Sequence, residues 1–138
     1  MDGGSSASIA LVAPKWLQEA LQVLFDGTSG VLLIASATDV DSLTMQEMDA
    51  APDFVLLDAD RDNSIAVSEV DRILQAWPKT ECVALVDNTS QIQLLKEAGA
   101  SLTLLKGASP QRLREVFQAL AEHKLRSEFT TRPLTPRL

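Results

Sequence analysis

The chain is poor in the residues and runs that mark several protein classes. Its 138 residues include a single cysteine, Cys82, which can form neither an internal disulfide nor a multi-cysteine zinc site. Apolar runs such as 31–35 and 54–57 are far shorter than the roughly 20 residues that span a bilayer. No N-terminal segment joins positive charge to a long apolar stretch, and neither G-x-G-x-x-G nor G-x-x-x-x-G-K-S/T occurs. We therefore expect a reduced, cytoplasmic protein without membrane contact, and neither a dinucleotide enzyme nor a P-loop protein.

Positive charge is scarce over most of the chain. The net charge is −7, with 19 acidic against 12 basic residues, so the surface as a whole does not suit nucleic acid. Basic residues gather only in 123–138, which holds Lys124, Arg126, Arg132 and Arg137 against Glu128. We expect this stretch to be a basic C-terminal tail or a linker. Apolar residues make up 46% of the chain, which suffices for one domain with its own core.

Short apolar runs alternate with stretches of helical spacing. Strands are predicted at 8–13, 31–35, 54–57, 82–86 and 102–105. Helices are predicted from Pro14 to Gly27, after Thr38 or Asp39, from the end of the 58–64 loop to Pro78, from Asn88 or Thr89 to Gly99, and from Ser109 onward. Strands that are apolar on both faces and joined by helices favour a parallel sheet covered on both sides. The predicted fold class is therefore α/β, a five-stranded, doubly wound (βα)5 sandwich over 8–122, preceded by a flexible segment at 1–7.

Polar residues follow the strands at the edge where the carboxyl ends of a parallel sheet meet, and such folds place their sites at this edge. Asp58 ends the third predicted strand, and Lys106 follows the fifth. Either Val86 or Asp87 ends the fourth. We expect the Asp58 carboxylate and the Lys106 ammonium group to face each other across this edge.

Three segments, Pro52–Asp58, Ala98–Ala100 and Leu104–Lys106, resemble in order and spacing those of the response-regulator receiver domain of two-component signalling. The resemblance covers 8–122 and implies a flavodoxin-like strand order. It implies that Asp58 is the phosphoacceptor, that Lys106 pairs with the phosphoryl oxygens, and that a histidine kinase of a phosphorelay is the partner. It also implies Mg²⁺ as cofactor and a signalling role rather than enzyme activity.

The sequence departs from this family's pattern around the expected phosphorylation site. The acidic pair that holds Mg²⁺ in the family corresponds here to Ala13 and Pro14, whose side chains cannot ligate a metal. The hydroxyl residue that grips the phosphoryl group corresponds to Val86, or to Asp87 if the alignment shifts, and the aromatic switch residue corresponds to Thr103. These departures predict a degenerate receiver, a pseudo-receiver that acts as a protein-interaction domain without phosphorylation.

A second interpretation concerns the loop that starts at Asp58. Asp58, Asp60 and Asp62, with Glu69 at the twelfth position, resemble an EF-hand calcium loop. An EF-hand needs a helix before the loop, whereas 54–57 is predicted to be a strand. The alternative function is therefore a divalent-metal site for Ca²⁺ or Mg²⁺ built from these carboxylates.

The resemblance also implies an output face made by the fourth helix, the fifth strand and the fifth helix. Family members often dimerise through this face, so we expect a homodimer here with Leu94 as its anchor. The polar residues expected on the face are Gln91, Gln93, Lys96, Gln111, Arg112 and Glu115.

Overall fold

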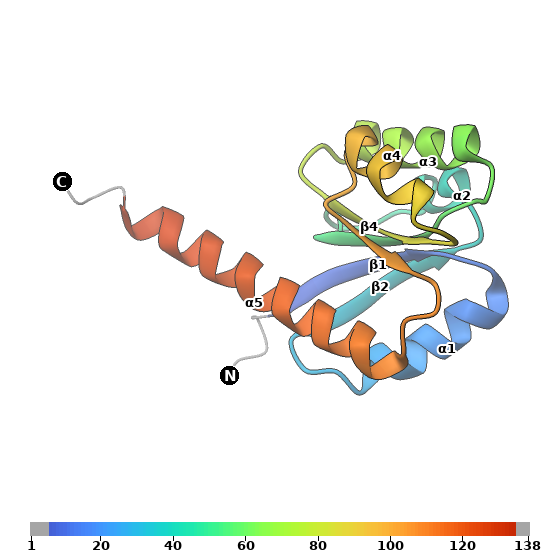
Figure 1. Cartoon of the computed structure of the whole chain (residues 1–138). Helices are drawn as coiled ribbons and strands as arrows, with labels where there is room; N and C mark the ends of the chain where they lie inside the picture. The colour runs from blue at the N-terminus through green and yellow to red at the C-terminus, as the bar shows by residue number, and fades with distance from the viewer. Residues whose placement is uncertain (1–5, 135–138) are drawn as a thin grey trace.

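Five parallel strands form one sheet in the computed structural model, which describes residues 6–134, with side chains as far as residue 125 (Figure 1). The strands are β1 (Ala7–Val12), β2 (Val31–Ala37), β3 (Phe54–Asp58), β4 (Glu81–Val86) and β5 (Leu102–Leu105). The helices are α1 (Lys15–Asp26), α2 (Val40–Thr44), α3 (Asn63–Ala76), α4 (Ser90–Ala98) and α5 (Pro110–Leu134). The strand order is β2-β1-β3-β4-β5, which is flavodoxin-like and confirms the predicted (βα)5 fold.

Helices cover both faces of the sheet. Helices α1 and α5 lie on one face, and α2, α3 and α4 lie on the other (Figure 1). On the first face, Phe117 of α5 is fully buried and meets two other rings edge-on, Phe25 of α1 at 5.2 Å and Phe54 of β3 at 6.2 Å. The aromatic contacts hold both helices against the sheet and leave the carboxyl edge of the strands open at the other end.

Local sequence signals explain where the helices start and end. The Asp62 carboxylate accepts hydrogen bonds from the backbone N–H of Ser64 at 2.9 Å and of Ile65 at 3.4 Å, so it caps the start of α3. Helix α4 ends at Gly99, whose φ of +119° is left-handed. A Cβ at this position would lie only 2.5 Å from Leu74 Cδ1, so glycine is required there on two grounds.

Several element boundaries differ from the sequence-based expectation. Ala7, predicted to be part of the flexible segment, is buried and begins β1, because its N–H donates a hydrogen bond to the Gly30 carbonyl. Helix α3 begins at Asn63, inside the predicted loop. Helix α5 continues past residue 122 to Leu134 and projects beyond the sheet (Figure 1), so most of the expected tail is helical. Residues 1–5 and 135–138 lie outside the described part of the chain.

Helix α5 is long, but it is rich in charged residues. Within residues 6–134, no helix combines the length and the apolar character needed to cross a lipid bilayer.

Candidate functional site

Three charged residues from three neighbouring strands meet at the carboxyl edge of the sheet. Asp58 is the last residue of β3, Asp87 follows β4, and Lys106 follows β5. The parallel register pairs Asp58 with Leu85, and Val86 with Leu105, so the three positions are at nearly the same height. The expected juxtaposition of Asp58 and Lys106 is therefore present, and Asp87 joins it.

Lys106 is the centre of this cluster. Its Nζ lies 3.1 Å from Asp58 Oδ1 and 3.4 Å from Asp87 Oδ1, and it donates a hydrogen bond of 3.1 Å to the Ala59 carbonyl. The side chains of Lys106, Asp58 and Asp87 are 31%, 16% and 22% exposed, so water screens the ion pairs only in part. One ammonium group thus interacts with two carboxylates and a carbonyl oxygen.

Two carboxylate oxygens in the cluster are buried without a hydrogen-bond donor from residues 6–125. They are Asp58 Oδ1 and Asp87 Oδ2. Asp58 Oδ1 is paired with Lys106 by charge, but not by a well-directed hydrogen bond. Asp87 Oδ2 lies 3.3 Å from Nε of Arg61, whose side chain is 88% exposed and whose contribution to the pair is therefore weak.

Val86 is not part of the site. It is fully buried and packs in the core beneath α3 and α4, so the first of the two alternatives for this position is wrong. Asp87 reaches Lys106 instead, because side chains alternate between the two faces at a strand end. Thr103 lies half-buried in β5 and takes part in none of the hydrogen bonds or ion pairs of the cluster described above.

The Gln91 side chain links, by hydrogen bonds, the two loops that flank the cluster. Its Nε2 donates to the Asp60 carbonyl at 2.9 Å, and its Oε1 accepts from the Asp87 N–H at 2.9 Å. The side chain is only 1% exposed, so Gln91 cannot belong to the output face on which we expected it. Its sequence position in the first turn of α4, close to the sheet edge, is the one signal that could have suggested this role.

The acidic residues after β3 do not assemble a metal site. Asp60 Oδ1 accepts the Asp62 N–H at 2.8 Å, and Glu69 Oε1 accepts the Asp60 N–H at 3.4 Å, while Asp62 caps α3. No group of three or more His, Cys, Asp or Glu side chains in the described part of the chain could hold a metal ion. The loop follows β3 rather than a helix, so the EF-hand interpretation of Asp58, Asp60, Asp62 and Glu69 is not supported.

The pKa values of these carboxyl groups show how differently they are placed. The hydroxyl and backbone N–H of Ser64, together with the N–H of Ile65, lower the pKa of Asp62. Burial raises the pKa of Glu69, and the charges of Asp60 and Asp58 raise it further. Glu69 is thus a half-buried carboxyl group, whereas Asp62 is an exposed helix cap.

The resemblance to receiver domains implies a Mg²⁺ ion beside Asp58, and the residues present do not fit one. A hollow of about 490 Å³ lies over the edge, but at the end of β1 it is lined by Ala13 and Pro14, which have no ligating side chain. The Asp58 carboxylate is itself engaged by Lys106.

Comparisons with known proteins agree with the fold. No protein-family model matches the sequence, and no curated protein matches it either. Among solved structures, the chain is similar to a LuxR-family DNA-binding response regulator from Silicibacter pomeroyi, with 23% identity over 85% of this chain and 93% of that chain, at a TM-score of 0.69. It is similar to a LuxR-family two-component response regulator from Aurantimonas sp. SI85-9A1, with 21% identity over 86% of each chain, at a TM-score of 0.73.

A third similar structure is a response regulator from Thermotoga maritima, with 18% identity over 85% of this chain and 98% of that chain, at a TM-score of 0.70. The chain therefore has the fold of response-regulator receiver domains. At these identities the likeness establishes the fold alone.

Proposed function

We propose that this chain is a receiver-type signalling module of a two-component system that acts through protein contacts without phosphorylation of Asp58. The receiver fold and the placement of Asp58 opposite Lys106 support the first part. The observation that carries the second part is the ion cluster, in which Asp87 already shares the one ammonium group with Asp58. The module is a binding domain rather than an enzyme, and its partner is a histidine kinase or another signalling protein.

Electrostatics at the edge oppose phosphoryl transfer. A phosphoryl donor brings negative charge to a place where Asp58 and Asp87 already exceed Lys106 in charge. Two like charges about 4 Å apart repel by about 4 kcal/mol at an effective dielectric constant near 20. Since about 1.4 kcal/mol changes a rate tenfold, we expect a repulsion of this size to slow transfer by about a thousandfold. Without metal ligands at Ala13 and Pro14, nothing on the β1 side offsets this repulsion.

The test is treatment with acetyl phosphate and Mg²⁺, followed by measurement of the intact mass. We expect no phosphoryl addition to the natural chain. The variant Ala13→Asp/Pro14→Asp/Asp87→Thr supplies two carboxylates and a hydroxyl, and aspartate is also a good residue to precede α1. We expect it to gain one phosphoryl group, and to lose it again when Asp58→Asn is added. Prompt stoichiometric addition to the natural chain at Asp58 would refute the proposal.

The α4–β5–α5 face is the surface through which we propose that the module meets a second copy. Leu94 is half-buried on it, and the remaining polar residues named for it, Gln91 excepted, are exposed. We expect a concentration-dependent dimer in sedimentation velocity that Leu94→Glu abolishes. Val23→Glu on exposed α1 is the matched control and should leave the dimer intact. A natural chain that stays monomeric at high concentration would contradict this use of the face.

A further inference from the structure

The outermost strand of the sheet, β2, is only partly covered by a helix. Helix α2 has five residues and rises about 8 Å, whereas the seven residues of β2 extend over about 23 Å, so about 15 Å of the strand has no helix above it. Leu32 lies on this face, because it pairs in register with Ser8 and its two neighbours in β2 pack on the face that α1 and α5 cover. The Leu32 side chain is 57% exposed.

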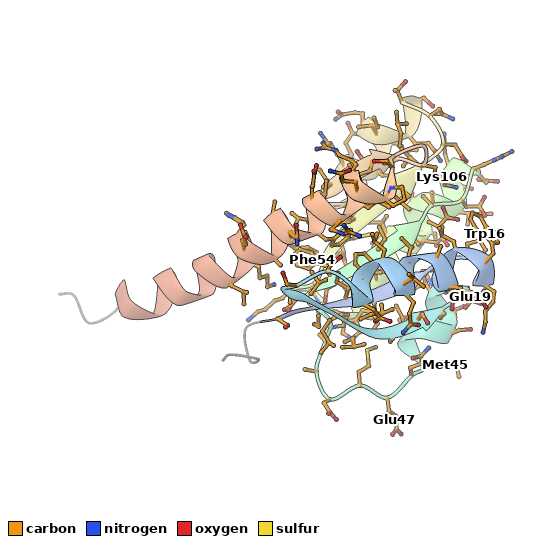
Figure 2. The ribbon with its side chains drawn as sticks, turned by 90° about the horizontal axis from the view of Figure 1, so that it is seen from below. Trp16, Glu19, Met45, Glu47, Phe54 and Lys106 are labelled. Carbon is orange, nitrogen blue, oxygen red and sulfur yellow. The ribbon has the colours of Figure 1, made fainter. Side chains whose placement is uncertain are left out.

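A hollow of about 370 Å³, which we call the β2 hollow, lies beside this strand. It is lined by residues of β1 and β2, among them the exposed Ile34, and by residues 47–51 of the loop after α2. Two of the lining side chains, Glu47 and Asp49, are acidic, and the others carry no charge. Figure 2 shows Glu47 on the same loop as Met45, whose side chain is 82% exposed. Exposed apolar side chains gathered around a hollow are typical of an interaction surface.

The charge on this side of the molecule is of one sign. Residues 16–60, which form α1, β2, α2 and β3, contain nine acidic residues and neither lysine nor arginine. Basic side chains from other parts of the chain pair with Asp41, Asp53 and Asp58, but none of those described lines the β2 hollow. A basic segment is therefore favoured there over an acidic one.

The chain has one basic segment of this kind, at the end of α5. Four basic residues and one acidic residue lie within 123–138. Residues 125–134 extend α5 beyond the sheet by about 15 Å, which matches the length of β2 that has no helix above it. Helix α5 lies on the opposite face of the sheet (Figure 1), so this extension cannot reach the β2 hollow of its own chain. A second copy of the chain supplies it.

We propose that the extension of α5 from one copy packs into the β2 hollow of a second copy. The positive charge of the extension meets Glu47 and Asp49, and its backbone follows the uncovered face of β2 over Leu32 and Ile34. Such a contact joins two different surfaces, so it closes into a dimer when each copy gives its extension to the other, and otherwise forms a longer assembly. The contact involves neither Asp58 nor the α4–β5–α5 face, so it is independent of the function proposed above.

The test is sedimentation velocity of the full chain in the Leu94→Glu background, which removes the dimer proposed through the other face. Arg126→Glu/Arg132→Glu reverses the charge of the extension, and Glu47→Lys/Asp49→Lys reverses that of the β2 hollow. We expect either double variant alone to weaken association at least about tenfold. An equal mixture of the two should restore association, because each reversed surface then meets its complement.

Matched controls separate the proposed contact from a general effect of charge or apolar area. Arg112→Glu/Arg114→Glu, at exposed positions near the start of α5, should leave association unchanged. Leu32→Thr removes apolar area beside the β2 hollow and should weaken association about tenfold. Leu105→Thr, at an exposed leucine on the opposite edge strand, should not.

Three results would overturn the proposal. The first is a Leu94→Glu chain that stays monomeric at high concentration. The second is undiminished association of the two charge-reversed variants, and the third is a mixture of them that fails to associate although circular dichroism shows both to be folded. A monomeric chain whose β2 hollow binds a synthetic peptide of alternating lysine and leucine would assign the hollow to another basic partner, and would exclude the second copy as its occupant.

Discussion

Replacing Lys106 by methionine tests the ion cluster most directly. Methionine keeps the apolar stem of the side chain and removes the charge. With Nζ at 3.1 and 3.4 Å from two carboxylate oxygens, each pair is worth about 5 kcal/mol of Coulomb energy at an effective dielectric constant near 20. Desolvation of the ammonium group offsets much of this energy, and removing one partner of a buried pair costs about 3–5 kcal/mol.

Lys106 is 31% exposed, so water and counterions reduce the cost to about 2 kcal/mol. For a chain of this length, that loss lowers the Tm by about 7 °C. Urea unfolding at neutral pH measures the free energy, and Lys79→Met at an exposed position is the matched control. A Lys106→Met variant as stable as the control would refute the account of the cluster.

Three further outcomes are expected. Gln91→Ala leaves the Asp60 carbonyl and the Asp87 N–H without their buried partner, and should cost about 2–3 kcal/mol in urea unfolding, whereas Gln93→Ala on the same helix should cost little. Because the folded pKa of Glu69 is raised, the natural chain loses stability as pH rises through that pKa. Glu69→Gln lacks this loss, so its relative stability should increase from acid to neutral pH, and a constant difference would contradict this. Burial, with the Glu69 charge, raises the pKa of Cys82 to about 12, so a disulfide reagent should label the thiol only as fast as the chain unfolds.

The sheet could be predicted from the sequence because each strand is an apolar run bounded by strong signals. Pro52 before β3 and Gly99 after α4 fixed neighbouring boundaries to within a few residues. The parallel arrangement then brought the ends of β3 and β5 together, which placed Asp58 near Lys106. The resemblance to receiver domains added the strand order, which periodicity alone does not specify.

The rest of the site depended on information that one sequence does not contain. Successive side chains of a strand point to opposite faces, so the pleat at the last residue of β4 decides whether Val86 or Asp87 faces Lys106. A shift of one residue would exchange the buried side chain for the one beside Lys106. Gln91 has the polarity of an exposed helix residue, and only the approach of the Asp60 loop makes it a buried partner. The acidic loop matched a calcium pattern because caps and turns use the same aspartates that metals do.

Helix α5 packs against the sheet as far as Lys124, whose Nζ lies 3.7 Å from Asp53 Oδ1, and its backbone continues to Leu134 beyond the sheet (Figure 1). At 1.5 Å per residue, the extension over residues 125–134 is about 15 Å long. A tilt of about 10° at the point where the helix leaves the sheet would move its end by about 3 Å. A small rearrangement beneath the helix is thus amplified into a displacement that a macromolecule bound to the end of α5 would detect.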